Sequence, residues 1–143
     1  MPVIDISDPT SMSIVTTLDL GDTWNRGLVT QGDYLYVGGE RKFSVIDISN
    51  PTAPAVKGSI TDSTGKQIYG VMRIVMKGDY AIIGNQAGNG VSLLDVSDPT
   101  SPSVKSYAQN SYWMASVTDV RIVDDMVFMS AGNADTFNVF QLS

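Results

Sequence analysis

The sequence predicts an all-β protein, a β-propeller built from four-stranded blades, with three repeats per chain. It repeats itself about every 45 residues, and a repeat of that length forms either a helical solenoid unit or a propeller blade. Short β-branched runs alternate with turns rich in Gly, Pro, Asn and Asp, and no window shows the apolar period of a helix. A β-sandwich would explain the strands but not the repetition, so the propeller is preferred.

Two markers carry the repeat, and both recur about every 45 residues. The first is the segment Val-Ile-Asp-Ile-Ser-Asp-Pro-Thr, whose copies stand at 3–10, 45–52 and 93–100, with a decayed copy at 139–143. The second is Gly-Asp-Tyr, at 32–34 and 78–80, with Asp-Asp-Met at the matching place, 124–126. Two independent markers in step indicate a true structural repeat.

The repeat divides residues 1–143, which are predicted to form a single repeat domain. Its parts are a half-blade (1–20), two blades (21–63 and 64–110) and a partial blade (111–143). The innermost strands outside the 64–110 blade are predicted at Leu28–Thr30 and Val117–Ile122.

The four strands of the 64–110 blade follow from its apolar runs and its turns. Met72–Met76 is a β-branched run that ends at the turn 77–79, and Tyr80–Gly84 is apolar nearly throughout, as a strand packed on both faces requires. Loop-forming residues precede Val91–Val96, and two prolines, which remove hydrogen-bond donors, precede Val104–Ala108. This more polar fourth strand suits the outer edge of a blade.

Composition excludes several classes of function. The chain has no Cys and no His, which removes disulfides, thiolate zinc sites, cysteine nucleophiles and any mechanism that needs an imidazole. Its net charge of −6 repels nucleic acid, and the nearest approach to a basic cluster, Glu40-Arg41-Lys42, is only a two-cation loop. No apolar run is long enough to span a bilayer. We therefore expect no catalytic residue, no metal site, no cofactor, no nucleic-acid partner and no membrane insertion.

The first marker and the turn after it resemble the LVIVD repeat family. The match to V-I-D-[IV]-S-[DN]-P-T-x-P is specific at 3–10, 45–54 and 93–102, and weak at 139–143, where Gln141 replaces the aspartate. The resemblance implies a β-propeller and no particular reaction. Because the family is common in secreted and surface-attached microbial proteins, it also implies an extracellular or cell-surface location. The N-terminus itself, with no basic region and no long apolar stretch, predicts no signal peptide.

The repeated aspartates Asp5, Asp47 and Asp95 are the most tempting candidates for calcium binding or acid–base chemistry. They recur once per blade, however, so a ring would hold them far apart. A carboxylate in an apolar strand usually accepts hydrogen bonds from a neighbouring turn. We therefore interpret Asp47 and Asp95 as structural acceptors that satisfy buried donors within their own blades.

A further motif runs from Thr17 to Trp24 and matches S/T-x-D-x-G-x-T-W, the Asp-box of sialidase-like propellers. It occurs once, in a different part of the blade from that family, and the chain is too short and too poor in arginine for a sialidase. We interpret the motif as a stabilised turn.

The candidate binding residues stand in the connections that precede the inner strands. Each connection carries a large aromatic residue beside loops rich in Asn, Gly and charge. Aromatics flanked by amides and carboxylates suit sugars or partner proteins. The competing interpretation is that the aromatics fill the seams between blades. The candidate ligand-binding residues are Trp24, Asn25, Arg26, Tyr69, Tyr112 and Trp113.

Closure of the ring is the remaining problem, because known propellers use roughly 4–8 blades. Residues 1–20 supply the third and fourth strands of a blade and residues 115–143 the first three, so two copies would most simply form a six-bladed C2 ring. The predicted fourth strand Met12–Leu20 of one chain is expected beside Phe137–Ser143 of another, although residues 1–7 and 137–143 would both occupy the position of the third strand. A piece of a longer propeller and an open fibre are the alternatives. The candidate assembly residues are Val3, Ile4, Ile6, Ile14, Val15, Leu18, Phe137, Val139, Phe140 and Leu142.

These observations favour a non-enzymatic recognition or scaffold module that self-assembles, most simply as a homodimer, and that binds a glycan or a protein at the cell surface or outside the cell. One alternative is a propeller enzyme of the glycoside hydrolase or lyase type, which would need two loop carboxyls roughly 5–10 Å apart in a cleft. The other is a structural subunit of a surface filament, with residues 1–7 or 137–143 donated to the neighbouring subunit.

Overall fold

The protein is described by a computed structural model that covers residues 1–132 and the backbone of residues 136–141. The regular structure in these residues consists of β-strands, which confirms the predicted all-β class. The strands form four antiparallel sheets in which each strand pairs with the next along the chain. The described residues contain no helix that is long and apolar enough to cross a membrane.

The sheets follow one another along the sequence. The first contains β1 (Pro2–Asp5) and β2 (Ser13–Thr17), and the second contains β3 (Asn25–Gln31), β4 (Tyr34–Gly39), β5 (Lys42–Asp47) and β6 (Ala55–Thr61). The third contains β7 (Val71–Lys77), β8 (Tyr80–Asn85), β9 (Gly90–Asp95) and β10 (Ser103–Gln109). The last contains β11 (Val117–Val123), β12 (Met126–Ala131) and β13 (Thr136–Gln141).

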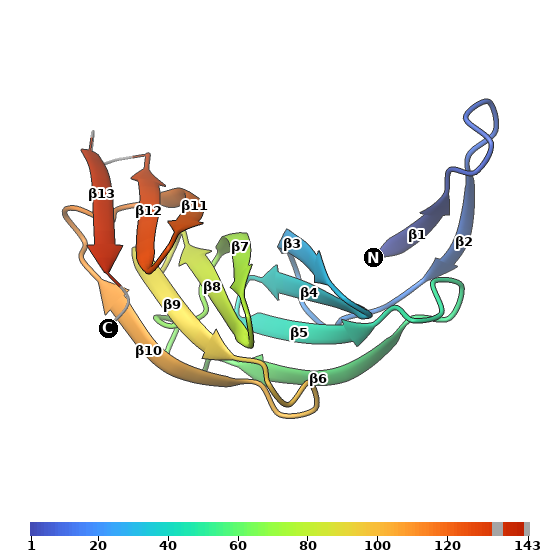
Figure 1. Ribbon diagram of the computed structural model, residues 1–143, viewed down its shortest axis with the longest axis horizontal. Coiled ribbons are helices and arrows are strands. Elements are labelled where there is room, and N and C mark those ends of the chain that lie inside the picture. The colour runs from blue at the N-terminus through green and yellow to red at the C-terminus, as the bar shows by residue number, and fades with distance from the viewer. Residues whose placement is uncertain (133–135, 142–143) are drawn as a thin grey trace.

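The sheets stand side by side in an arc (Figure 1). The strands β3, β7 and β11 lie on its concave side, and the outer strands β6 and β10 lie on its convex side. This is how blades surround the axis of a β-propeller, as the repeat predicts. The arc is open, with β1–β2 at one end and β11–β13 at the other, so the chain is a partial propeller.

The repeated motif makes two consecutive turns that side chains hold in place. In the first turn, Asp95 Oδ1 accepts hydrogen bonds from the backbone N of Ser97 at 2.9 Å and from its hydroxyl at 2.7 Å. In the second, Asp98 Oδ1 accepts from the backbone N and the hydroxyl of Thr100 at 2.9 and 2.6 Å. Equivalent pairs are Asp47–Ser49 with Asn50–Thr52, and Asp5–Ser7 with Asp8–Thr10. The motif recurs because each blade uses this pair of turns to pass from its third strand to its fourth.

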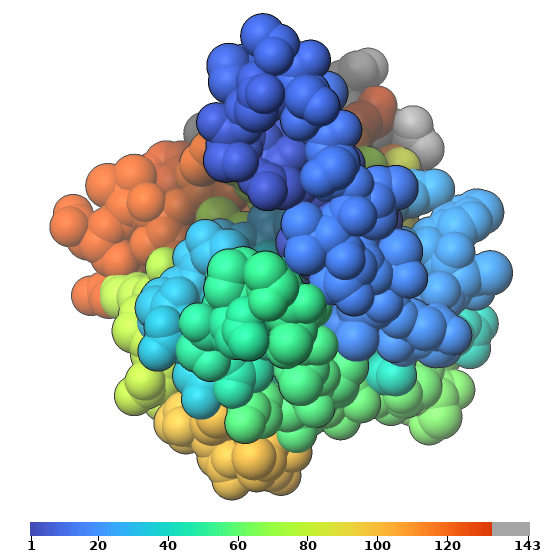
Figure 2. Space-filling model, turned by 90° about the vertical axis from the view of Figure 1, so that its right-hand side faces the viewer, coloured from blue at the N-terminus to red at the C-terminus, as the bar shows by residue number. Residues whose placement is uncertain are grey.

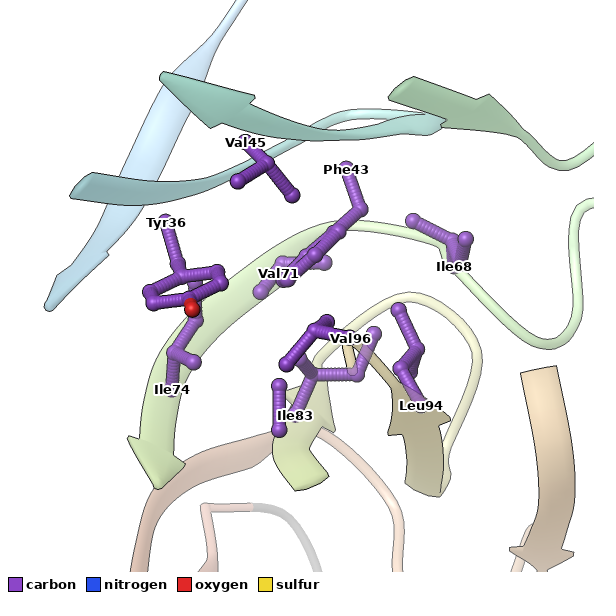
Figure 3. Close-up of a cluster of buried hydrophobic side chains, with 10 residues drawn as sticks. Tyr36, Phe43, Val45, Ile68, Val71, Ile74, Ile83, Leu94 and Val96 are labelled. Carbon is purple, nitrogen blue, oxygen red and sulfur yellow. The ribbon is translucent and has the colours of Figure 1, made fainter. Parts of the chain in front are cut away.

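Adjacent blades pack face to face, and residues at equivalent strand positions fill each seam between them. Tyr36 of β4 and Ile74 of β7 belong to the buried cluster between the two four-stranded sheets (Figure 3). Ile82 of β8 and Val120 of β11 take the corresponding places in the next seam. The sheets approach closely there, because a Cβ atom on Gly84 would lie 2.6 Å from Cγ2 of Val120. A glycine in the second strand therefore lets the seam close.

The faces at the two ends of the arc are covered less completely. Leu28 occupies the position in β3 that Ile74 occupies in β7, but Leu28 is 52% exposed. It is exposed because the neighbouring sheet, among the described residues, holds only β1 and β2. Phe128 of β12 stands in the register position of Tyr36 and is half-buried, beside a shallow pocket of about 110 Å³. Figure 2 looks onto the N-terminal end, where the β1–β2 hairpin (dark blue) stands out from the rest of the arc.

Candidate functional site

The connections at one end of the blades form a surface that we call the loop face. It combines the connections from an outer strand to the next inner strand with the loops between second and third strands. Its residues are 18–26, 39–42, 62–70, 85–90 and 110–116. The structure places all the candidate ligand-binding residues of the sequence on this face.

Aliphatic side chains fill the seams beneath the loop face. Leu20, Ile68 and Met114 are buried, with 4%, 0% and 3% of their surface exposed. The tryptophans of the same connections are open to solvent, with Trp24 56% exposed and Trp113 48% exposed. The interpretation that the tryptophans fill the seams is therefore wrong, and part of each indole is accessible.

Two arginines stack on aromatic rings of the loop face. Cζ of Arg26 lies 4.6 Å from the ring centroid of Trp24, and Cζ of Arg41 lies 4.8 Å from that of Tyr69. Arg26 also donates from Nη1 to Oε1 of Gln86 at 3.1 Å. Stacking orients the planar guanidinium groups without neutralising their charge.

A buried carboxylate organises the connection that carries Tyr69. Asp62 Oδ2 accepts hydrogen bonds from the backbone N atoms of residues 66–68 at 2.8, 2.7 and 3.0 Å. Its Oδ1 accepts from the backbone N and the hydroxyl of Thr64 at 2.7 and 2.6 Å. Burial acts to raise the pKa of Asp62, but the hydrogen bonds outweigh it and hold the pKa well below its usual value. Asp62 is therefore an ionised internal anchor, which the sequence analysis missed because it lies outside the repeated motif.

Further hydrogen bonds join the loops of this seam into one unit. Nδ2 of the buried Asn85 donates to Gln67 O at 2.9 Å and to Ser92 Oγ at 2.9 Å. Gly70 N donates to the carbonyl O of residue 40 at 2.8 Å, and Gly70 O accepts from the backbone N of Gln86 at 2.9 Å. The loops 39–42, 62–70 and 85–90 are thus tied together, and such a network makes the surface rigid.

The last connection presents Tyr112 and Trp113. Oδ1 of Asn110 accepts from the backbone N of both residues at 2.9 Å, and their rings meet edge to face with centroids 4.7 Å apart. Tyr112 is 72% exposed. Ser116 N donates to Oδ1 of Asn89 at 3.1 Å, which joins this connection to the loop 85–90. Asn25, the remaining candidate, is exposed at the start of β3.

The cations of the loop face differ from those elsewhere in the described residues in whether they form ion pairs with aspartates. Five of the nine cations form ion pairs with aspartates: Lys57, Arg73, Lys77, Lys105 and Arg121. No ion pair is found within residues 1–132 for the other cations, and all of these lie on the loop face: Arg26, Arg41, Lys42 and Lys66. The Arg41-Lys42 pair is the one local signal of this cluster in the sequence, and the fold brings the other two cations to it.

The repeated aspartates serve their own turns. Besides the serine hydrogen bonds, Asp47 pairs with Lys57 at 3.1 Å and Asp95 pairs with Lys105 at 2.9 Å. The expectation that their donors are buried is wrong, because these turns lie exposed at the end of the blades opposite the loop face. The part of the chain that the structure describes holds no group of three or more Asp or Glu side chains placed to hold a metal ion.

The dependence of stability on pH in the acid range should reveal the role of Asp95. Hydrogen bonds from the hydroxyl and backbone of Ser97, and then from Lys105, lower the pKa of Asp95 from 3.8 to about 2. A lowered folded-state pKa adds stability above the unfolded-state pKa, and this stability is lost as pH falls through the folded-state value. Asp95→Asn is therefore expected to be less stable than wild type at pH 7, by a difference that shrinks between about pH 4 and pH 2. Urea unfolding at several pH values measures it, and a difference unchanged at pH 2 would contradict the assignment.

The segment Thr17 to Trp24 forms a turn that its aspartates stabilise. Asp19 Oδ1 accepts from Gly21 N at 2.9 Å, and Gly21 has a φ of +63°, which favours glycine. Asp22 Oδ1 accepts from Thr23 N at 2.8 Å, while its Oδ2 is buried against Gly39 with no hydrogen-bond partner among the described residues. The interpretation of this motif as a turn agrees with these contacts.

Most of the candidate assembly residues lie on the β1–β2 hairpin and on β13, and Leu18 directly follows β2. Ile4, Ile6, Ile14 and Val15 are 51%, 70%, 67% and 41% exposed, and Val3 and Leu18 are half-buried. Phe137, Val139 and Phe140 belong to β13, whose backbone pairs with β12, and Leu142 lies outside the described residues. Both β1 and β13 carry copies of the third-strand motif, so each end of the arc holds a third strand.

Known proteins share this repeat and this arrangement of sheets. The family model for the LVIVD repeat matches residues 1–19, 21–62 and 70–109. No curated protein matches the chain significantly.

Three solved structures with a similar fold are longer than this chain. A protein from Lactobacillus plantarum superposes with a TM-score of 0.82 at 15% identity, over 99% of this chain and 47% of that one. The β-propeller domain of Cps50 (Swd1) from Myceliophteria thermophila superposes with a TM-score of 0.70 at 13% identity, over 98% of this chain and 49% of that one. Hsv2 from Kluyveromyces lactis gives a TM-score of 0.51 at 12% identity, over 82% of this chain and 33% of that one. The chain thus spans about half the length of the first two.

Proposed function

Because the chain belongs to the LVIVD repeat family, we propose that it is a non-enzymatic recognition and scaffold module that forms part of a larger propeller. The observation that carries this proposal is the loop face, where exposed aromatic rings and stacked arginines stand on hydrogen-bonded connections. A rigid surface of this kind binds with little loss of conformational entropy. Aromatic rings with polar neighbours suit a glycan or a partner protein.

The position of the recurrent aspartates supports a role without catalysis. Asp47 and Asp95 are engaged by turn hydrogen bonds and ion pairs, at the end of the blades opposite the loop face. They are therefore poorly placed to act as general acid and base on a ligand of the loop face. The extracellular or cell-surface location that the family resemblance implies is part of the same proposal.

Replacing the exposed tryptophans tests the recognition role. Trp24→Ala and Trp113→Ala are each expected to weaken binding of the ligand found by glycan or protein-array screening by about tenfold or more, because a stacked aromatic is a typical anchor of an interface. Tyr107→Ala is a matched control, since Tyr107 is 45% exposed on the outer strand β10. Equal binding by wild type and both tryptophan variants would rule out the loop face as the binding surface.

We also propose that the module self-assembles through its end faces. Leu28 and Phe128 occupy the positions that Ile74 and Tyr36 fill inside the molecule, so the Leu28 face of one copy is shaped to cover the Phe128 face of another. The chain spans 47% and 49% of two propeller-like chains, and two copies would therefore match the length of one such chain. The simplest product is a two-fold ring, and a contact that fails to close would give a filament.

Such a ring requires one of the two third strands, β1 or β13, to leave the position it has in this structure. The second strand of the hairpin, β2, is a fourth strand by position and would complete the blade of β11–β13 in the other copy. Its partner β1 then competes with β13 for the third-strand place. We propose that β1 yields, because β1 is four residues long and mostly exposed, whereas β13 is six residues long.

A further inference from the structure

Three loop-face cations without an ion pair within residues 1–132, Arg26, Arg41 and Lys66, lie in the loops of one seam. We propose that this seam, between the blades of β3–β6 and β7–β10, binds a polyanionic glycan whose sugars carry carboxylates, and that Arg26 and Arg41 hold those carboxylates. The inference rests on the proposed recognition role and names the ligand class of the same surface.

The two guanidinium groups are attached to the same hydrogen-bonded loops, Arg26 by a hydrogen bond and Arg41 by ring stacking, although they are distant in sequence. Arg26 donates a hydrogen bond to the side chain of Gln86, and the backbone N of Gln86 donates one to Gly70 O. Gly70 follows Tyr69, on whose ring Arg41 stacks. The guanidinium of Arg41 also lies against Gly65, where a Cβ atom would come within 3.3 Å of its Nη2. The seam therefore presents two oriented guanidinium groups rather than two mobile chains.

The loop face is less acidic than the whole chain, because its four cations are balanced by four carboxylates, Asp19, Asp22, Glu40 and Asp62, whereas the chain carries a net charge of −6. Lys66 lies in the same loops, whereas Nζ of Lys42 donates to Leu20 O at 2.8 Å in the neighbouring seam. The carboxylate of Asp62 is buried and fully engaged by backbone and hydroxyl donors, so it is not available as a partner for these cations. The carboxylate of Glu40 accepts from the hydroxyl of Thr23 at 3.0 Å. Acidic residues of the repeated turns lie at the opposite end of the blades, and the local field, rather than the net charge, attracts a ligand.

The neighbouring rings favour a sugar over an acidic peptide. A carboxylated sugar presents a planar carboxylate, which suits the fork of an arginine, together with an apolar C–H face, which suits an aromatic ring. Trp24 is exposed beside Arg26, and Tyr112 and Trp113 are exposed on the adjoining connection, which Asn89 ties to the loop of Gln86. A peptide of glutamates offers the carboxylates without the stacked sugar face.

Binding of three polymers to the intact chain tests the proposal. Calorimetry should detect binding of polygalacturonate, a carboxylated glycan, and this binding should weaken as salt rises, because exposed charges are screened. Dextran, a neutral glycan, and polyglutamate, an acidic peptide, are each expected to bind at least about tenfold more weakly.

Charge-removing variants locate the site. Arg26→Gln and Arg41→Gln are each expected to weaken polygalacturonate binding by about tenfold, the loss of one charge-assisted contact. Lys105→Gln removes the same charge from the outer strand β10, where Lys105 pairs with Asp95, and should leave binding within about twofold of wild type.

Each contrary result overturns the proposal in a distinct way. The anion-binding site is refuted if polygalacturonate fails to bind, or if Lys105→Gln weakens its binding as much as the arginine variants do. Polyglutamate binding as tightly as polygalacturonate makes the ligand an acidic peptide and refutes the glycan. Binding of dextran that depends on Trp24 and Trp113 but not on the arginines refutes this inference while leaving the recognition role in place.

Discussion

Replacing Asp62 by alanine is expected to lower the free energy of unfolding by roughly 3 kcal/mol. The side chain is 7% exposed and accepts five hydrogen bonds, three of them from consecutive backbone N–H groups of residues 66–68. Alanine leaves those donors without a partner in a place that water enters poorly, and each unpaired donor costs free energy. Urea unfolding followed by fluorescence measures the loss.

Two further variants separate the charge from the geometry. Asp62→Asn keeps an acceptor oxygen but loses the charge. Its free energy of unfolding should therefore lie between those of wild type and Asp62→Ala. Asp98→Ala removes a carboxylate with the same threonine contacts in an exposed turn, and it should change stability far less. The assignment of Asp62 as the internal anchor is wrong if Asp62→Ala and Asp98→Ala unfold at the same urea concentration.

Replacing Leu28 by aspartate is expected to break the assembly into single chains. Wild type should show about twice the 15.3 kDa chain mass in light scattering at micromolar concentration. In that assembly Leu28 enters the seam beside Phe128 of the other copy, as Ile74 does beside Tyr36 within the chain. Burying a leucine is worth roughly 1.5–3 kcal/mol and burying an unpaired carboxylate is costly, so dissociation should be favoured by at least about a hundredfold.

The control for this variant is Val56→Asp. Val56 is 43% exposed on the outer strand β6, so the same kind of change occurs there away from the end faces. The variant should keep the mass of wild type. A wild-type mass of 15.3 kDa would refute self-assembly itself. A dimer that persists in Leu28→Asp would refute only the Leu28 contact.

The strands and blades could be predicted from the sequence because their signals are local. Strand β8 is an apolar run between two turns, and the predicted Tyr80–Gly84 falls within Tyr80–Asn85. The predicted strand Met12–Leu20 exceeds β2, because residues 18–20 already belong to the loop face and Leu20 turns into a seam. Alternation and turn residues mark where a strand exists, but tertiary contacts decide where it ends.

The candidate site could be predicted only in part. Its aromatic residues were visible in the sequence because each precedes an inner strand at a recurrent place. The cation cluster was not visible, because Arg26, Arg41 and Lys66 are separated in the chain and only the Arg41-Lys42 pair is adjacent. The difference between filling a seam and facing solvent was also undecided, since Ile68 and Tyr69 are neighbours and either side chain could have turned inward.

The sequence by itself determined that the chain consists of β-blades and that the aspartates of its motif hold turns. These features depend on residues close together in the chain, whose hydrogen bonds and φ preferences act whatever surrounds them. Tertiary structure alone decided that Asp62 is a buried anchor, that Leu28 and Phe128 occupy the end faces, and that Arg26 and Arg41 come to one seam. Each of these depends on which blade packs beside which, and side chains far apart in the sequence meet only when the seams form.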